Sequence, residues 1–325
     1  MKKTQVSVII PVFNGSLLIG RCLDSIFNQE GPFKLEVIVI DDGSTDNSLD
    51  LIRSYSKPII LLTQFNQGPA SARNKGIEVA VGKYLAFLDA DDYWLPDFLK
   101  ETVNFLENNA EAIAVSVGQI HRIIGKPDSI APAILKSEPK KHVAPIVLPD
   151  FFSFWAEHNH VCTGSVLMRT DIVKKTGGQR PELRITEDLE FWAYLATYGK
   201  WGFIPKVLFV SDGGAVTKAR GWLEKNKIRW ASAPPVNVWE ERIIQNLPQP
   251  LPEEYLLSRG GIAANLAYCM ILSSRDKLAR QTVSENIKYL PKGKLTFLFK
   301  IASMATVLWS ILCVFLRTRE FKRKI

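Results

Sequence analysis

The sequence predicts an α/β fold in which helices flank a mostly parallel sheet, followed by a C-terminal helical extension. A chain of 325 residues with 46% apolar side chains can build one large core and an appendage. Short runs rich in Val and Ile, ended by turn residues, alternate with segments of helical periodicity, as expected for strands covered on both faces. We expect three regions: an α/β domain over 1–215, a mainly helical region over 216–290, and an apolar tail with basic flanks over 291–325.

The first βαβ unit is predicted over residues 6–46. Strands are expected at 6–14 (VSVIIPVFN) and within 35–46 (LEVIVIDDGSTD). The stretch 15–29 between them predicts a helix, because its apolar residues recur at helical spacing. These residues are Leu18, Ile19, Cys22, Leu23, Ile26 and Phe27.

The alternation of strands and helices continues beyond this unit. The expected elements are, in order, helix 47–55, strand 58–64, helix 66–82, strand 83–92, an irregular Pro- and Lys-rich excursion over 123–150, a strand and short helix within 164–178, and a helix and strand within 186–205. This order predicts a doubly wound sheet, whose ligands bind outside the carboxyl ends of the strands.

Cysteine usage and net charge suggest a compartment and a partner. The four cysteines are far apart with no C-x-x-C pair, which favours free thiols in the reducing cytoplasm. The net charge is +8, and the stretch 317–325 alone holds five basic residues and one acidic residue. Because this cluster follows lipid-like sequence, we expect a membrane surface as its partner and no nucleic acid.

Two acidic clusters end the predicted strands. Asp41 and Asp42 stand at one strand end, and Asp89 and Asp91 at another, two apart in a segment expected to be extended, so that both point to the same side. Crowded carboxylates repel unless a cation sits among them. Oxygen ligands of this kind suit Mg²⁺ or Mn²⁺, which complete their shell with water and substrate phosphates. A diphosphate-bearing substrate is therefore expected.

These motifs together resemble a known family. The segments VSVIIPVFN, VIDDGSTD, NQGPASARNKGI, FLDADD and TEDLEFW are similar, in order and spacing, to the motifs of family 2 glycosyltransferases. The resemblance covers about residues 5 to 210. It implies a Rossmann-like GT-A fold and an inverting, metal-dependent enzyme that moves a sugar from a nucleoside diphosphate, a UDP-sugar foremost, to a hydroxyl of a glycan or lipid-linked acceptor.

The resemblance also implies roles for particular residues. Asp41 and Asp42 would lie at the base and ribose, Asp91 would be the direct metal ligand with Asp89 nearer the ribose or donor sugar, and Asp188 would be the catalytic base, paired with Glu187. Further residues would line the donor pocket, with Arg73 near the nucleotide or its phosphates. They are Pro11, Val12, Asn14, Gly68, Arg73, Asn74 and Ala90.

Each motif taken alone also has a structural reading. Aspartates after a strand make good turns and helix caps, acidic residues favour a helix start, and most charged side chains are simply solvated. His158 and His160 could form a metal pair, but without a third ligand nearby we favour loop histidines, and no later histidine exists to join the metal. Trp192 is expected in the core, with stacking on a sugar as the alternative, and Arg220 either contacts phosphate or lies on a surface loop.

Two other functions remain open at this stage. A sugar nucleotidyltransferase also uses an α/β fold and paired aspartates, although no Gly-rich loop with Arg and Lys is present to hold a triphosphate. A membrane-tethered protein could also bind nucleotide sugars without turnover. Dinucleotide-binding G-x-G-x-x-G and P-loop signatures are absent from the sequence, which gives dehydrogenase and NTPase functions little support.

The apolar stretch 295–316 predicts a helix long enough to cross a bilayer. Both of its flanks are basic, and a single crossing would translocate one of them, so a helix lying in the cytoplasmic face is favoured over a span. The alternatives are packing on the protein or a homodimer interface. We therefore expect a cytoplasmic protein attached peripherally or monotopically to the inner face of the cell membrane through 295–325.

Overall fold

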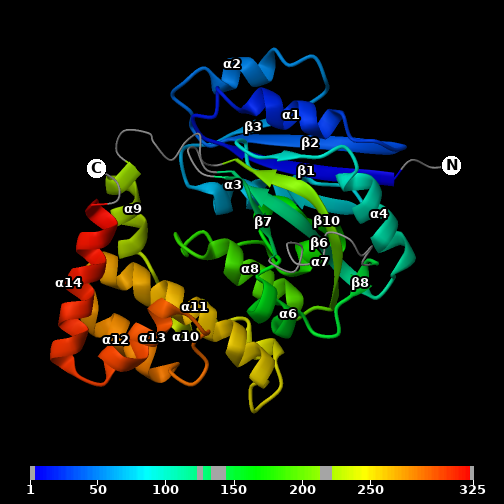
Figure 1. Cartoon of the computed structure of the whole chain (residues 1–325). Coiled ribbons are helices and arrows are strands. Elements are labelled where there is room, and N and C mark those ends of the chain that lie inside the picture. Colours follow the sequence, from blue (N-terminus) through cyan, green and yellow to red (C-terminus); the bar gives the residue numbers. More distant parts are fainter. Residues whose placement is uncertain (1–3, 123–126, 133–143, 213–221, 323–325) are drawn as a thin grey trace. The chain divides into compact units, whose positions relative to one another are not determined.

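The computed structural model describes residues 4–122, 127–132, 144–212 and 222–322 (Figure 1). The chain divides into two compact units. The sheet unit comprises the described residues within 1–154, 158–181 and 187–218. The helical unit comprises those within 155–157, 182–186 and 219–325. Arg220, expected either to contact phosphate or to lie on a surface loop, is outside the described residues.

The sheet unit is a mixed, mostly parallel sheet with the strand order β3-β2-β1-β4-β9-β6-β10-β5, with β7 beside β6 and β8 beside β10. Strands β1, β2, β3 and β4 are mutually parallel, as are β6 and β10, whereas β9 runs antiparallel between β4 and β6. The strands are β1 (Thr4–Val12), β2 (Phe33–Asp41), β3 (Ile60–Thr63), β4 (Tyr84–Phe87), β5 (Tyr93–Trp94), β6 (Ala112–His121), β7 (Ser129–Ala131), β8 (Ile146–Val147), β9 (Val166–Arg169) and β10 (Lys200–Ser211).

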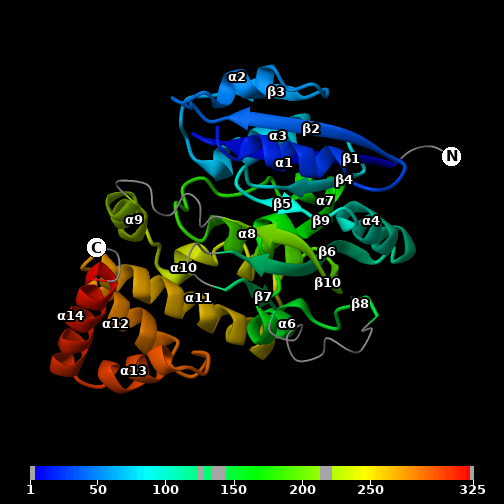
Figure 2. The same cartoon turned by 45° about the horizontal axis from the view of Figure 1, so that its top comes forward.

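Helices cover both faces of this sheet (Figure 2). The helices along this part of the chain are α1 (Ile19–Phe27), α2 (Ser48–Arg53), α3 (Pro69–Val79), α4 (Phe98–Asn108), α6 (Phe151–His158), α7 (Thr170–Lys175) and α8 (Glu187–Ala196). Val6, Val8 and Ile10 of β1 belong to the core cluster with α1, α2 and α4. Ile9 points to the other face, where a Cβ on Gly76 of α3 would come within 2.5 Å of it. This two-sided burial explains the unbroken apolar runs in the sequence.

Element existence was well predicted, but several boundaries were not. The strand expected over 83–92 ends at Phe87, because Asp92 N–H donates to the Asp89 carbonyl at 3.0 Å and closes a turn. The prediction that 89–91 is extended is therefore wrong. The excursion 123–150 includes the short strands β7 and β8, which sequence periodicity did not reveal.

The helical unit contains α9 (Trp222–Ala231), α10 (Val236–Trp239), α11 (Glu253–Leu272), α12 (Asp276–Glu285), α13 (Lys294–Ser303) and α14 (Thr306–Lys322). Helix α11 passes a length and hydropathy test for a membrane span, but 61% of its apolar window is buried, as in the core helix of a soluble unit. Gly260 permits close packing on α11, since a Cβ there would lie 1.9 Å from the Tyr289 carbonyl oxygen.

The expectation of one continuous helix over 295–316 is wrong. The chain breaks after Ser303 and reverses into a hairpin, with α13 and α14 packed against each other. Phe299, Trp309 and Leu316 are buried in the helical unit. The two helices are therefore part of a folded unit, and neither is long enough alone to cross a 30 Å hydrocarbon layer.

Candidate active site

The winding of the sheet reverses between β1 and β4, and this is where a doubly wound sheet binds its ligands. Strand β4 pairs with β1 only as far as Ile9, so the last residues of β1 have no partner on that side. Pro11, which has no N–H to donate, stands in this unpaired stretch opposite Ile40 of β2. Of the predicted aspartates, Asp41 ends β2 and Asp42 follows it, and Asp89 and Asp91 follow β4.

Asp42 holds the loop that follows β3. Its carboxylate accepts hydrogen bonds from the Gln67 and Gly68 N–H groups at 2.9 and 2.8 Å and from the Gln64 side chain at 2.8 Å. Gly68 has φ +90°, and its carbonyl begins helix α3. Asp42 is therefore fully engaged within the chain, where it holds the loop between β3 and α3.

Asp41 is the carboxylate left available for a ligand. It is buried, and one oxygen accepts only a weak hydrogen bond from Ser44 N–H at 3.3 Å. The other oxygen, Oδ1, has no hydrogen-bond partner among the described residues. A buried acceptor of this kind costs free energy unless a donor arrives, so Asp41 is the better candidate of the pair for a hydrogen bond to the nucleotide.

Asn14 joins the two loops beside this carboxylate. It adopts φ +54°, and its side-chain oxygen accepts hydrogen bonds from Thr45 N–H at 2.7 Å and Asp46 N–H at 3.3 Å. Its own N–H donates to the Ser44 hydroxyl. Asn14, which follows Val12 at the end of β1, therefore fixes the loop after β2 to the loop after β1.

Arg73 is buried and connects its own motif, NQGPASARNKGI, to the motif FLDADD. Its Nη2 donates to Asp89 Oδ1 at 2.6 Å, and its Nη1 donates to the Gln179 side-chain oxygen at 3.2 Å. Next to it, Asn74 makes two hydrogen bonds of 2.8 Å with the Gln179 backbone. Asn74 therefore anchors the segment after α7.

Sequence reasoning missed Gln179 in this network. Its only sequence signal is its place directly after Gly177 and Gly178, both of which have positive φ and mark a turn that must be held in place. Its side-chain nitrogen is buried without a partner among the described residues. Gln179 therefore positions Arg73 and leaves one amide donor unused.

The turn Asp89–Asp92 brings three carboxyl groups close together. Burial, reinforced by Asp89 and Asp91, raises the pKa of Asp92 to about 8, and its carboxylate accepts the Asp212 N–H at 2.8 Å. Arg21 of α1 lies across the turn. Its guanidinium donates to the Asp91 carbonyl at 2.6 Å and to the Asp212 carboxylate at 2.5 Å. The turn is thus fixed by contacts from α1 and the end of β10, neither of which was predicted.

Within this turn, Asp91 is the residue whose chemistry fits a metal ligand. Burial and the neighbouring Asp89 raise its pKa, and Arg21 opposes this shift only in part, so a bound cation would favour the ionised form. Among the described residues no side chain donates a hydrogen bond to its carboxylate, whereas Asp89 already pairs with Arg73. The described residues contain no cluster of three or more metal-ligating side chains, so water and substrate phosphates would supply the other ligands.

Asp188 lies in the first turn of α8 and belongs to the same electrostatic network. Burial raises its pKa, Arg73 opposes that shift, and Asp89 adds to it. Correspondingly, Asp89 and Asp188 together outweigh the effect of burial and raise the pKa of Arg73. The structure therefore brings the predicted base, arginine and metal-motif aspartate together. Glu187 beside Asp188 is buried.

Two other predictions concern aromatic surroundings. Trp192 is fully buried against Phe87 and Phe191, so the prediction that it lies in the core is confirmed. His160 is fully buried and packs against Phe154 and other aromatic rings. His160 lies in the loop that follows α6, as predicted, but its side chain belongs to the core, whereas His158 is the last residue of helix α6 and not a loop residue.

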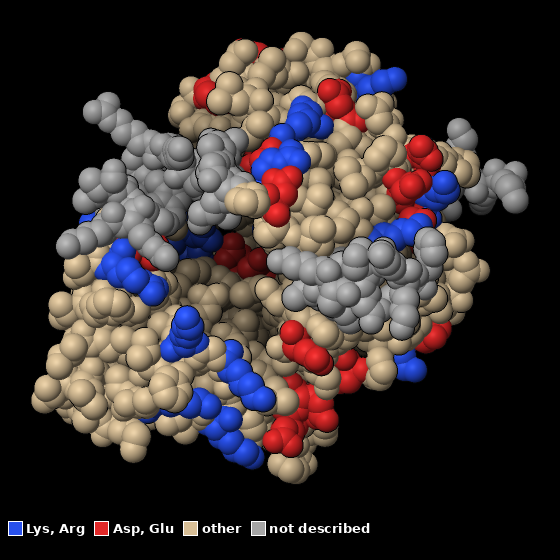
Figure 3. All heavy atoms as spheres, viewed as in Figure 1, with Lys and Arg blue, Asp and Glu red and all other residues tan. Residues whose placement is uncertain are grey.

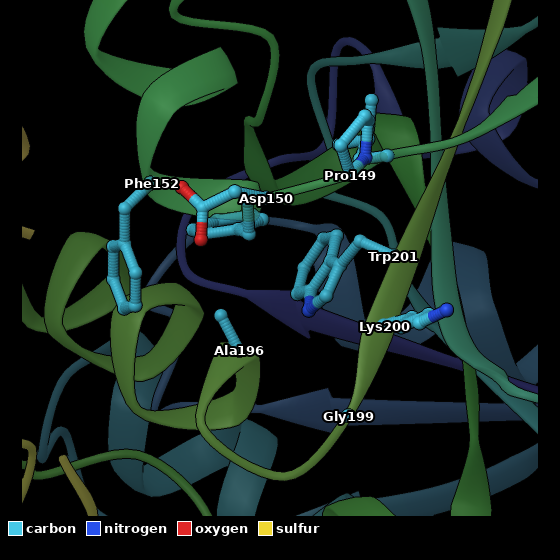
Figure 4. Close-up of a pocket in the computed structure, with 9 residues that line it drawn as sticks. Pro149, Asp150, Phe152, Ala196, Gly199, Lys200 and Trp201 are labelled. Atoms are coloured by element: carbon cyan, nitrogen blue, oxygen red, sulfur yellow. The ribbon is translucent and has the colours of Figure 1, made fainter. Parts of the chain in front are cut away.

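A separate cavity of about 190 Å³ lies at the opposite edge of the sheet (Figure 4). Its wall includes Asp150, Phe152, and Lys200 and Trp201 at the amino end of β10. Since β10 is parallel to β6, and β9 is antiparallel to both β6 and β4, this end of β10 faces away from the carboxyl end of β4. None of the predicted site residues lines the cavity, so it is distinct from the candidate active site.

The mostly parallel sheet with carboxylates at its switch point defines a nucleotide-binding α/β protein of the GT-A type. Residues 7–177, more than half of the chain, match the family model described as glycosyl transferase family 2. The chain belongs to this family, and the predicted family and fold are confirmed.

Comparison with individual proteins gives the same family and fold. A poly(ribitol-phosphate) β-glucosyltransferase from Bacillus spizizenii is 38% identical over 128 residues, which are 38% of this chain and 20% of that protein. Matches to the first curated relatives span a fifth to less than half of their lengths.

Two solved structures share the fold at low sequence identity. S. aureus TarS 1–349 in complex with UDP-GlcNAc has a TM-score of 0.54 at 17% identity, covering 88% of this chain and 89% of that one. The mannosyltransferase PcManGT from Pyrobaculum calidifontis, in complex with GDP-Man and Mn²⁺, has a TM-score of 0.57 at 18% identity, covering 97% and 88%.

Proposed function

We propose that this chain is an inverting glycosyltransferase that moves a sugar from a nucleoside-diphosphate sugar, foremost a UDP-sugar, to a hydroxyl group. The observation that carries the proposal is the convergence of Arg73, Asp89 and Asp188 at the carboxyl edge of the sheet. Family membership and the nucleotide sugars bound by TarS and PcManGT support the same class of donor.

The residues of the site divide the work between donor binding and proton transfer. Asp41 accepts a hydrogen bond from the nucleotide, and Asp42 and Asn14 hold the loops around it. Asp188 takes the proton of the acceptor hydroxyl as the new bond forms, which is worth about 10²- to 10⁴-fold in rate. Its raised pKa makes it a stronger base than an ordinary aspartate.

Asp91, with Asp89, would hold Mn²⁺ or Mg²⁺. Such an ion, when bound, supplies positive charge that stabilises the departing nucleoside diphosphate. Arg73 pairs with Asp89 and orients its carboxylate. With the base and the leaving group on opposite sides of the anomeric carbon, displacement is in line and the configuration inverts.

We assign the acceptor to glycans or lipid-linked precursors at the inner face of the cell membrane, in a cytoplasmic protein that has no nucleic-acid partner. The relative named for poly(ribitol-phosphate) supports a polymer acceptor, and the exposed apolar side chains of α13 and α14 support membrane attachment. A homodimer interface formed by the same apolar sequence is the alternative to membrane attachment.

The test combines donor binding with turnover. A thermal-shift panel of nucleoside diphosphates and nucleotide sugars, with and without Mn²⁺, should show metal-dependent stabilisation by one donor, because only a ligand of the native state raises stability. Asp188→Asn should then keep donor binding and lose transfer. Intact transfer by this variant would overturn the assigned base.

The same assay separates the two alternative functions. Release of pyrophosphate instead of a nucleoside diphosphate would indicate a sugar nucleotidyltransferase. Tight donor binding without product, across a broad panel of acceptors, would indicate a catalytically inactive membrane-tethered protein. Neither outcome is expected.

A further inference from the structure

The helical unit exposes a continuous apolar stripe on the α13–α14 hairpin. On α14 the exposed residues follow the i, i+1, i+4, i+7, i+8 spacing of one helix face, and those on α13 follow the same rule. Met304 at the turn is 81% exposed, Val307 71% and Ile311 61%. The hairpin stripe consists of Phe297, Leu298, Ile301, Met304, Val307, Leu308, Ile311, Val314 and Phe315.

The opposite face of the hairpin is fixed to the rest of the helical unit. Trp309 donates to the Asp276 carbonyl at 2.9 Å, and Arg317 pairs with the Asp276 carboxylate at 2.6 Å. Arg280 donates to the Thr306 hydroxyl at 2.6 Å. These contacts hold the hairpin in place on the helical unit. A contiguous apolar patch on such a fixed surface indicates an interaction site.

Basic residues lie at both far ends of the stripe. Lys294 precedes Phe297 and Leu298 by one turn of α13, and Arg319 follows Phe315 by one turn of α14; both are exposed. The helical unit as a whole contains nineteen Lys and Arg against ten Asp and Glu, so it carries the chain's positive excess. Figure 3 shows Lys and Arg spread over the helices of this unit.

We infer that the hairpin stripe docks in the plane of a bilayer that contains anionic lipid. The apolar side chains would enter the boundary between headgroups and acyl chains, while Lys294 and Arg319 would meet acidic headgroups. The inference rests on the proposed site of action at the inner membrane face, and it specifies the surface, the in-plane mode and the lipid charge.

A second copy of the chain fits this surface less well. An isologous contact would place one positively charged unit against another. Glu320 is the only acidic residue in the described part of 291–325, and it already accepts a hydrogen bond from Tyr268 at 3.0 Å. Lys294 and Arg319 would thus find no acidic partner on the stripe of a second copy, whereas an anionic bilayer supplies one everywhere.

The experiment measures binding of the full chain to vesicles without donor or acceptor. Flotation with phosphatidylcholine vesicles, and with vesicles that also contain phosphatidylglycerol, should show binding to the anionic vesicles that weakens with salt. The triple variant Val307→Ser, Ile311→Ser, Val314→Ser should lower the partition coefficient by about tenfold or more. Lys294→Gln with Arg319→Gln should weaken the preference for phosphatidylglycerol.

A matched control replaces three exposed apolar residues of the sheet unit by serine: Leu51, Ile60 and Val81. This control should bind vesicles as the unsubstituted chain does. Circular dichroism and thermal unfolding verify folding, since the replaced stripe side chains are exposed and support no core.

Two results would overturn the inference. One is equal vesicle binding by the stripe variant and the control. The other is a dimer, seen by light scattering, that the stripe variant dissociates while the unsubstituted chain ignores vesicles. Donor binding is measured separately by thermal shift in solution without vesicles. Vesicle binding can therefore be confirmed even if glycosyl transfer fails, and donor binding can be confirmed even if vesicle binding fails.

Discussion

Replacing His160 should make the fold less sensitive to acid. The imidazole is fully buried among Phe151, Phe154 and Phe203, and neither ring nitrogen has a hydrogen-bond partner among the described residues. Burial, with a smaller effect from His158, lowers its pKa to about 3. His160→Phe and His160→Leu both remove the titrating group while keeping an apolar side chain.

The magnitude follows from the difference in proton binding. The unfolded chain takes up a proton near the ordinary pKa of about 6.5, and the folded chain does so only near 3. Stability is therefore lost as the pH falls below about 6.5 and continues to fall toward about 3. Between pH 7 and pH 5, protonation linked to His160 lowers the free energy of unfolding by about 2 kcal/mol.

The assay is urea unfolding of the unsubstituted chain and both variants from pH 7 to pH 5. The difference in unfolding free energy between chain and variant should change by about 2 kcal/mol over this range, equally for Phe and Leu. A packing penalty in either variant shifts the difference at all pH values alike, so only its slope is informative. A difference that stays constant with pH would refute the buried, neutral imidazole.

Three further predictions address packing, the pocket and the base. Gly260→Ala should destabilise the chain by about 2 kcal/mol or more, because its Cβ meets a backbone carbonyl at 1.9 Å, whereas Gly261→Ala, which meets nothing within 4 Å, should stabilise it by about 0.5–1 kcal/mol in urea unfolding. Asp42→Ala, which removes three accepted hydrogen bonds, should cost about 3 kcal/mol of unfolding free energy, while Asp41→Ala should mainly raise the donor Kd, measured by calorimetry; equal stability losses would contradict this division. The rate of transfer should fall with decreasing pH through the raised pKa of Asp188, above the range of an ordinary aspartate, and a rate that stays flat down to pH 4 would exclude this base.

The sequence was most informative where one physical rule acted alone. Apolar runs and their turn residues located β1 to β4, and the carboxyl ends of these strands located Asp41, Asp42 and Asp89, because the edge of a parallel sheet is fixed by topology. The pattern of apolar runs was enough to locate these strands, because both faces of the sheet are buried.

It was least informative where a role depends on contacts between distant segments. Asp41 and Asp42 look alike in sequence, and only the loop after β3 decides that Asp42 is engaged and Asp41 is available. Gln179 acts through Arg73, 106 residues earlier in the chain. The hairpin break after Ser303 has no Gly or Pro to announce it and follows from packing within the helical unit.

The antiparallel strand β9 has a consequence for biogenesis. Among the described strands, β9 is the one that links β4 to β6, yet it follows β4 by nearly 80 residues in the chain. Until the ribosome has released Val166–Arg169, both neighbouring strands present open edges that can pair with other nascent chains. Shielding by chaperones should therefore matter most while this part of the protein is being synthesised, and a premature stop before residue 166 should yield aggregates instead of a soluble fragment.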